Sequence, residues 1–208
     1  MSGPSTGASA IRAVTEADVD QVARTMARAF TGDPFMGWLI PESRWPGAFE
    51  RWDCCQLVHS FLPRLICQTT PSAVAAAFWA PPGPKPASPE AEAVVDRGSR
   101  EAFADRYELA MAAFELLHEN APEEPSWRLV QVGTHPDWRG RGVGERLLRT
   151  QLDEIDRSDA AAFLEVSNPR VVPFYTRLGF EVTKQVEVPE GGPVVPLMYR
   201  PARSRREG

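Results

Sequence analysis

Residues 134–145, with the sequence THPDWRGRGVGE, decide the fold of this chain. They join a predicted strand, residues 128–134, to a predicted helix, residues 142–156, whose apolar side chains recur on one face. Glycine lets backbone N–H groups approach a bulky anion because no Cβ stands in the way. A helix N-terminus adds unpaired donors and about half a positive charge. The stretch therefore predicts a pyrophosphate-binding turn, with Arg139 and Arg141 as additional phosphate ligands.

Two common nucleotide sites fit this turn poorly. A P-loop requires Gly-Lys-Ser/Thr, whereas Gly144 is followed by Glu145 and Arg146, so ATPases and kinases of that type are excluded. The dinucleotide fingerprint requires glycines at its first, third and sixth places, and counted from Gly140 the sixth place holds Glu145. A Rossmann site is therefore disfavoured, and the pattern that remains is Arg-x-x-Gly-x-Gly over residues 139–144.

Composition narrows the class of protein. With 208 residues, 43% of them hydrophobic and 25% charged, the chain has the balance of a soluble globular protein, and its length predicts one domain over residues 1–208. The net charge of −5 gives no general attraction for nucleic acid and favours a cationic small molecule. An apolar run at residues 73–80 stops well short of the roughly 18 residues of a membrane span. Residues 1–10 lack the features of a signal peptide.

Cysteine usage indicates the compartment. Cys54, Cys55 and Cys67 are an odd number without the spacing of metal ligands. We therefore expect neither a disulfide framework nor a metal site, and a reducing cytoplasm fits. The expected partners are small molecules, with no nucleic acid and no membrane, and the sequence leaves open whether the chain is a monomer or a homodimer.

The rest of the chain alternates helices and strands. This order predicts an α/β fold, with a mixed sheet covered by helices on both faces. We expect residues 1–9 and the basic tail, residues 201–208, to be disordered. The predicted elements are a strand at 10–14, a helix from about 18 to 30, a helix from 46 to 67 bent or ended at Pro63, a strand at 73–80, one or two helices over 88–118, a strand at 160–166, a helix at 171–178 closed by Gly179, and strands at 181–188 and 194–200.

The pattern at residues 139–144 resembles the acyl-CoA-binding signature of the GNAT N-acyltransferase superfamily. Two further blocks extend this resemblance, FLEVSNP at 163–169 and PFYTRLGF at 173–180. Within the superfamily the chain is most similar to the puromycin N-acetyltransferases, through residues 124–127, 173–180 and 186–191. The last 80 or so residues match strongly, and the first 120 match only in outline.

The resemblance implies a mostly antiparallel central sheet with a splayed strand pair that holds acetyl-CoA. The pantetheine arm would pair with strand backbone, and the pyrophosphate would lie on the glycine turn. Asn168 is expected at the cofactor arm and also as a cap before Pro169. The residues implied for acetyl-CoA are Val132, Gly133, Thr134, Arg139, Gly140, Arg141, Gly142, Val143, Gly144 and Asn168.

Tyr175 and Glu165 are the candidate catalytic residues. Tyr175 matches the family tyrosine that faces the CoA sulfur, where a phenol with an ordinary pKa of about 10 can protonate the departing thiolate; alternatively it packs in a helix–sheet core. Strand alternation places Glu165 and Ser167 on one face. Glu165 is the candidate base, acting directly or through a water molecule. The alternative is a strand-end carboxylate paired with an arginine.

Four residues of the first half are candidates for the acceptor pocket: Asp33, Phe35, Trp38 and Trp79. Aromatic rings can hold a planar acceptor and a carboxylate can attract its ammonium group, although the same residues can form an aromatic core. Among the histidines, His135 is expected to orient the turn, and His59 and His118 to be structural or exposed.

Together these features predict an acetyl-CoA-dependent N-acetyltransferase that acts by direct transfer on a primary amine of a small molecule. An aminonucleoside antibiotic such as puromycin is one acceptor, which would make the protein an antibiotic-resistance enzyme. The alternatives are a protein N-terminus, a lysine or a metabolite amine as acceptor, or a non-catalytic domain that binds CoA.

Overall fold

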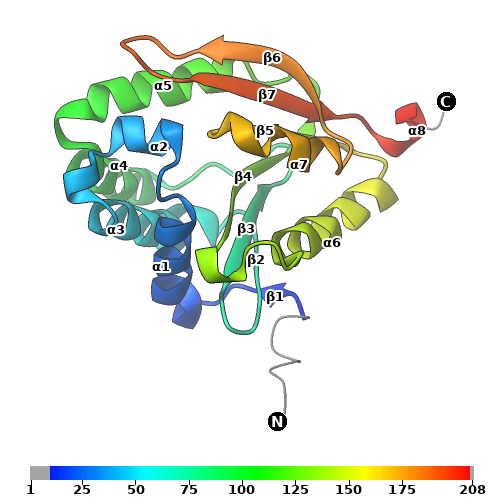
Figure 1. Cartoon of the computed structure of the whole chain (residues 1–208), viewed down its shortest axis with the longest axis horizontal. Helices are drawn as coiled ribbons and strands as arrows, with labels where there is room; N and C mark the ends of the chain where they lie inside the picture. Colours follow the sequence, from blue (N-terminus) through cyan, green and yellow to red (C-terminus); the bar gives the residue numbers. More distant parts are fainter. Residues whose placement is uncertain (1–9, 207–208) are drawn as a thin grey trace.

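A seven-stranded sheet runs through the centre of the protein, in the order β1-β2-β3-β4-β5-β7-β6 (Figure 1). The computed structural model describes residues 10–206. Neighbouring strands are antiparallel except β4 and β5, which are parallel. The strands are β1 (Arg12–Ala13), β2 (Ile66–Thr69), β3 (Ala75–Ala80), β4 (Ser126–Thr134), β5 (Ala161–Glu165), β6 (Glu181–Glu187) and β7 (Val194–Arg200). The predicted mixed, mostly antiparallel sheet is confirmed.

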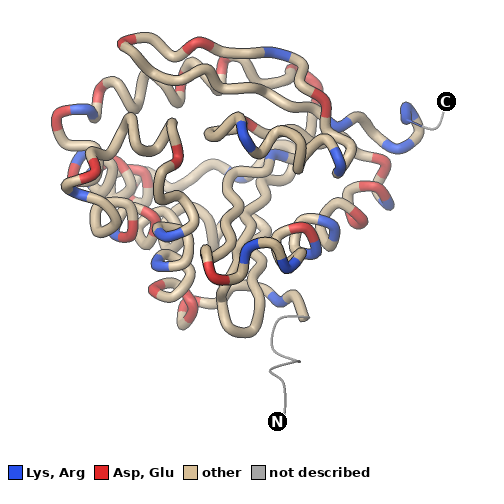
Figure 2. The backbone as a smooth tube through the Cα atoms, in the orientation of Figure 1, with Lys and Arg blue, Asp and Glu red and all other residues tan. Residues whose placement is uncertain are grey.

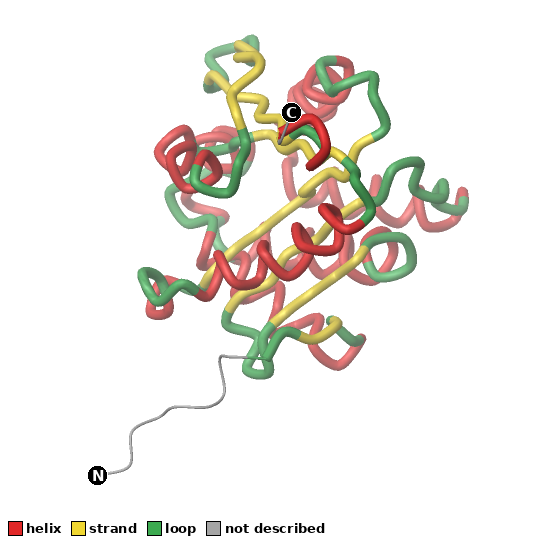
Figure 3. Tube along the Cα trace, turned by 90° about the vertical axis from the view of Figure 1, so that its right-hand side faces the viewer, coloured by secondary structure: helices red, strands yellow, loops and turns green. Residues whose placement is uncertain are grey.

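Helices cover both faces of the sheet (Figure 3). Helices α1 to α5 gather on one side, and α6 and α7 lie on the other (Figure 1). The helices are α1 (Val19–Ala29), α2 (Pro34–Leu39), α3 (Gly47–Gln56), α4 (Pro89–Phe103), α5 (Tyr107–Glu119), α6 (Val143–Arg157), α7 (Val172–Thr176) and α8 (Arg203–Arg206). Within the described chain, no helix is both long enough and apolar enough to cross a membrane.

The two faces of the sheet form two separate hydrophobic cores. Strand β3 belongs to both, because Ala76 and Phe78 pack with α1 to α5 whereas Ala75, Ala77 and Trp79 pack with α6. Side chains that alternate between two buried faces explain why this strand is a continuous apolar run in the sequence.

The predicted helix over residues 46–67 is helical as far as Phe61, and its predicted break at Pro63 is confirmed. Helix α3 ends at Gln56 and continues as a π-helical turn, Leu57–Phe61. Pro63 has no N–H to continue the helical bonding, and the chain then enters β2, which pairs with β3. Cys67 consequently lies in a buried strand. For residues 88–118 the sequence predicts one or two helices. The structure has two, α4 and α5, which are separated at Ala104, where φ is +51°.

The C-terminal segment is ordered where disorder was expected. Residues 203–206 form α8, and Ser204 donates its backbone N–H to Asp159 at 2.8 Å. Arg205 pairs with Glu124 at 2.9 Å, and Arg206 pairs with Asp156. The expected disorder at residues 1–9 and 207–208 lies outside the described residues.

The position of α1 depends on a glycine in β4. A Cβ on Gly133 would lie 2.7 Å from Met26 Sδ and 2.8 Å from Ala29 Cβ, so no other residue fits here without displacing the helix. The last turn of α1 is thereby held close to β4. Asp33, at the start of α2, follows this turn directly.

Candidate active site

Strands β4 and β5 separate at the centre of the sheet. They pair from Ser126 with Ala161 through Leu129 with Leu164 and then diverge. Beyond this point β4 stays paired with β3, while Val166 donates its N–H to the carbonyl oxygen of Pro196 in β7. The gap opens into a cavity of about 950 Å³, which residues 128–134 line from one side and residues 164–168 from the other. The predicted splayed pair is therefore present.

The glycine turn lies at one end of this cavity. Gly142 is the N-cap of α6 with φ of +70°, and no described side chain caps the helix. Because the first N–H groups of a helix have no partner within it, they are available to an anion. Arg139 and Gly144 line the cavity, and Arg139 is held by Ala29 O at 2.8 Å. These donors fit a phosphate group.

The other residues of the turn have structural contacts. Gly140 has φ of +72°, which favours glycine. The Arg141 guanidinium lies 4.9 Å from the centre of the Trp138 ring, a cation–π contact. Val143, the first residue of α6, is buried in the hydrophobic core that α6 forms with the sheet. Its side chain therefore has a packing role. His135 accepts the N–H of Asp137 through Nδ1 at 3.3 Å, which places it where a turn-orienting residue is expected.

Tyr175 lines the cavity from α7 and is 8% exposed. Its ring meets Phe174 and Phe180 edge-on, at centroid distances of 5.2 and 6.2 Å. Its hydroxyl has no hydrogen-bond partner among the residues that the structure describes. Burial, and secondarily the charge of Asp33, raise the pKa of this phenol, which therefore keeps its proton at neutral pH. Tyr175 therefore packs against its aromatic neighbours and also has an O–H group available as a proton donor.

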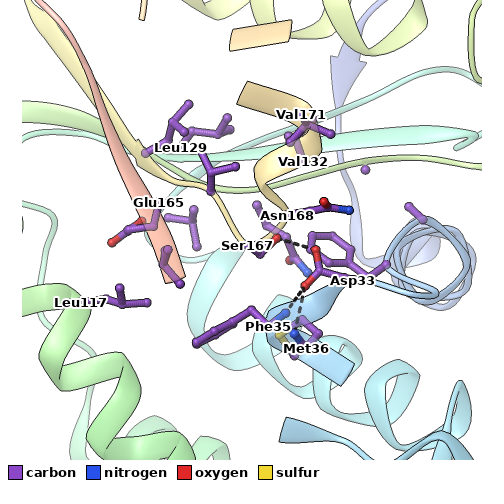
Figure 4. Close-up of a pocket in the computed structure, with 18 of the residues that line it drawn as sticks. Asp33, Phe35, Met36, Leu117, Leu129, Val132, Glu165, Ser167, Asn168 and Val171 are labelled. Carbon is purple, nitrogen blue, oxygen red and sulfur yellow. Dashed lines mark hydrogen bonds between the residues drawn. The ribbon is translucent and has the colours of Figure 1, made fainter. Parts of the chain in front are cut away.

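Glu165 also lines the cavity, at the end of β5 (Figure 4). It is ion-paired with Arg128. Arg128 Nε donates to Oε2 at 3.1 Å, and Arg128 Nη2 lies 2.8 Å from Oε1 without the alignment of a hydrogen bond. The side chain of Glu165 is 10% exposed. The arginine-paired alternative is thus found.

Asp33 is a buried carboxylate with three hydrogen bonds (Figure 4). Oδ1 accepts the N–H groups of Phe35 at 3.1 Å and Met36 at 2.9 Å, which makes Asp33 the N-cap of α2. Oδ2 accepts the hydroxyl of Ser167 at 2.6 Å. Burial raises the pKa of Asp33 and outweighs the lowering effect of these bonds.

The predicted acceptor residues divide into two pairs. Asp33 and Phe35 line the cavity. Trp38 lies behind Phe35, with ring centroids 6.3 Å apart, and Trp79 is fully buried in β3 against α6. In the described part of the chain, these two tryptophans belong to packed clusters and not to the cavity lining. The aromatic-core alternative therefore describes Trp38 and Trp79.

The structure adds lining residues that the sequence did not indicate. His118, expected to be structural or exposed, borders the cavity from α5 together with Glu115. Asn168, which the sequence did predict, also lines the cavity. Its Oδ1 accepts the N–H of Arg170 at 3.1 Å, so the expected cap is present as well. The further lining residues are Trp52, Gln56, Phe61, Phe114 and Ser167. Only Ser167 had a signal, because it shares a strand face with Glu165.

Comparison with known proteins finds a family match over part of the chain and shared folds over most of it. Residues 102–182 match the acetyltransferase (GNAT) domain family. This range includes the splayed strands, the glycine turn and Tyr175.

Solved structures share the fold over most of the chain. A histone acetyltransferase HPA2 and related acetyltransferase from Corynebacterium glutamicum is 23% identical, with a TM-score of 0.67 and coverage of 92% of this chain and 95% of that one. Arylalkylamine N-acetyltransferase 2 from Aedes aegypti is 12% identical (TM-score 0.61, 92% and 98% covered). The ribosomal-protein-S18-alanine N-acetyltransferase from Escherichia coli is 15% identical (TM-score 0.53, 93% of each chain covered).

Proposed function

We propose that this chain, an N-acetyltransferase with a GNAT domain over residues 102–182, transfers the acetyl group of acetyl-CoA directly to a primary amine of a small molecule. The observation that carries the proposal is the single cavity that contains the open edge of β4, one end of the glycine turn, Tyr175 and Asp33. Donor and acceptor can therefore meet within one cavity, as direct transfer requires.

The donor side of the cavity fits acetyl-CoA, which supplies an activated thioester when bound. The N–H groups at the start of α6 and the Arg139 guanidinium would hold the diphosphate. Residues 130–134 present unpaired backbone groups toward β5, and these would bond the amides of the pantetheine arm. Tyr175 holds a proton at neutral pH and would give it to sulfur as the thioester bond breaks.

The acceptor side favours an amine attached to an aromatic or apolar body. Phe35, Phe61 and Phe114 line it with aromatic rings, and Asp33 and Glu115 provide acidic groups. Such a lining attracts a cation through carboxylates and stacks a planar body on rings. An aminonucleoside such as puromycin has this chemistry, and the sequence blocks at 173–180 and 186–191 support it further, so antibiotic resistance is part of the proposal. The Aedes neighbour, named for arylalkylamines, is consistent with the same class.

The proposal extends to the setting of the protein. Cys54, Cys55 and Cys67 are free thiols, which fits the cytoplasm. We expect a monomer or homodimer whose partners are small molecules, with neither nucleic acid nor membrane involved.

The test is release of free thiol from acetyl-CoA in the presence of a panel of amines. The panel contains puromycin, phenylethylamine, a lysine-containing peptide blocked at its N-terminus, and a lysine-free peptide with a free N-terminus. We expect amine-dependent thiol release with the first two. Release with a peptide alone would replace the small-molecule acceptor by a protein, and CoA binding in calorimetry without any amine-dependent release would make the chain a binding domain.

A further inference from the structure

Asp33 and Ser167 bring together two parts of the chain that are 134 residues apart. Asp33 belongs to the start of α2, and Ser167 to the loop that follows β5 where β5 leaves β4. Both line the cavity that contains Tyr175, and the hydroxyl of Ser167 points to Asp33 (Figure 4). The bond of 2.6 Å is short, as expected for a hydroxyl bonded to a carboxylate.

We infer that Ser167 and Asp33 form the proton exit of the reaction, in which Ser167 Oγ accepts a proton from the substrate amine while it passes its own proton to Asp33 Oδ2. This inference rests on the proposed function. Ser167 is the catalytic residue of the pair, because it would touch the amine. Asp33 acts through Ser167.

The geometry of Asp33 suits this role better than that of Glu165. Glu165 faces the guanidinium of Arg128 with both oxygens, at 2.8 and 3.1 Å. Asp33 has no ion-pair partner among residues 10–206, and its three donors are neutral. A buried carboxylate that lacks a cation gains more from a proton than one bound to arginine. The raised pKa of Asp33 agrees with this argument.

The other titratable groups near Asp33 lie on different elements. Tyr175 on α7 senses the charge of Asp33, as the direction of its pKa shows. The remaining charged or titratable cavity residues are Glu115, His118, Arg128, Arg139 and Glu165, and in the described chain none of them is hydrogen-bonded to Asp33. The carboxylate of Asp33 and the phenol of Tyr175 are therefore the base and acid that influence each other.

The proton balance closes with these two groups. One N–H bond of the ammonium breaks, an O–H bond forms on Ser167, and the original Ser167 proton moves to Asp33. The freed nitrogen lone pair forms the C–N bond as the C–S bond breaks, and the sulfur receives the proton of Tyr175. The second proton lost by nitrogen restores Tyr175, and Asp33 later releases its proton to water, so one proton leaves in each turnover.

The experiment compares pH profiles of kcat/KM for two amines of different basicity, puromycin and phenylethylamine, in Asp33→Asn, Ser167→Ala and Ser167→Thr. Asparagine keeps the oxygen that caps α2 but removes the charge. We expect Asp33→Asn and Ser167→Ala each to lower kcat/KM by about 100-fold or more. In Asp33→Asn, the fall of kcat/KM at low pH that wild type shows with both amines should disappear. Ser167→Thr keeps a hydroxyl group and should recover much of the wild-type kcat/KM.

Asp18→Asn is the matched control, because it removes a carboxylate at the start of another helix, paired with Arg12. It should leave the pH profile unchanged. Thermal denaturation checks folding, and if Asp33→Asn does not fold, the Ser167 variants carry the test. The inference is overturned if Asp33→Asn keeps both the wild-type kcat/KM and its fall at low pH, or if Ser167→Ala has the same kcat/KM as wild type. It is also overturned if Glu165→Gln is the one variant in which the fall at low pH disappears. A wild-type protein with no amine-dependent thiol release would instead contradict the proposed function.

Discussion

Tyr175 unites two properties that rarely occur together, a nearly buried ring and a hydroxyl without a hydrogen-bond partner among the described residues. Buried tyrosine hydroxyls usually find a partner inside the protein. A free phenol that lines a cavity is instead available to bond a molecule that enters it, which is what the proposed role of Tyr175 requires.

Replacement of Tyr175 by phenylalanine tests that link. Phenylalanine preserves the ring contacts with Phe174 and Phe180 and removes the proton. We expect kcat to fall roughly 10- to 1000-fold while CoA affinity, measured by calorimetry, stays close to wild type. The matched control is Tyr199→Phe, which removes a hydroxyl bonded to Glu124 at the surface. Equal kcat in Tyr175→Phe and wild type would remove Tyr175 from the reaction.

Asp53, in α3, is fully buried, and neither of its oxygens has a hydrogen bond of good geometry to any residue between 10 and 206. Burial raises its pKa to about 7, and the nearby Gln131 only partly offsets this. The unfolded chain ionises the same group with an ordinary pKa of about 3.9. Protonated Asp53 therefore favours the folded state. This contribution is complete at low pH and is lost as the pH rises through about 7.

The corresponding variant is Asp53→Asn, which has no charge to bury. Between pH 5 and pH 8 the free energy of unfolding of wild type should fall relative to that of Asp53→Asn, by an amount on the order of a few kcal/mol. Urea denaturation at several pH values measures both curves. Parallel curves would mean that Asp53 keeps its charge in the folded protein.

At the scale of elements, Gly133 determines how closely α1 approaches β4. An added methyl group would meet Met26 and Ala29 at less than van der Waals distance. Gly133→Ala should therefore lower the free energy of unfolding by about 1–3 kcal/mol, as overpacking of a core does. It should also reduce turnover, because α1 leads directly to Asp33. Gly37→Ala is the control, since nothing lies within 4 Å of its Cβ position. Similar stability of the two variants would show that α1 can move without cost.

The same elements show what a sequence can and cannot predict. The glycine turn, β4 and α6 follow from local patterns, and the structure has them within about two residues of the expected bounds. The start of β2 was missed because a strand of only four residues is too short to show a clear period, and its pairing with β3 depends on residues far along the chain.

Site residues follow the same division. Arg139, Gly144 and Tyr175 belong to two local sequence blocks, 139–144 and 173–180, that the sequence singled out, and all three line the cavity. His118 reaches it because α5 packs against α2, and no local pattern reports that long-range packing. Trp79 was misassigned for the converse reason, since an aromatic residue in a strand can face either core and the choice depends on register.

At the scale of the whole molecule, the cavity joins two parts of the chain. The proposed donor side comes from residues 128–144 and 164–175, inside the range that matches the GNAT domain family, whereas Phe35, Trp52 and Phe61 come from the preceding half. Charges of both signs are interspersed over the outer helices, apart from the arginines of the C-terminal helix (Figure 2). The surface therefore has no single-sign patch on these helices that would mark a second binding site, and the proposed selectivity rests on the cavity.

The divergence of β4 from β5 also has an evolutionary consequence. In the proposed function, one strand pair would hold the thioester and separate helices would contact the amine, so mutations in these helices would change the acceptor and leave the donor site intact. A combinatorial library restricted to the helical wall, at Phe35, Phe114, Glu115 and His118, would explore new acceptors against a constant donor.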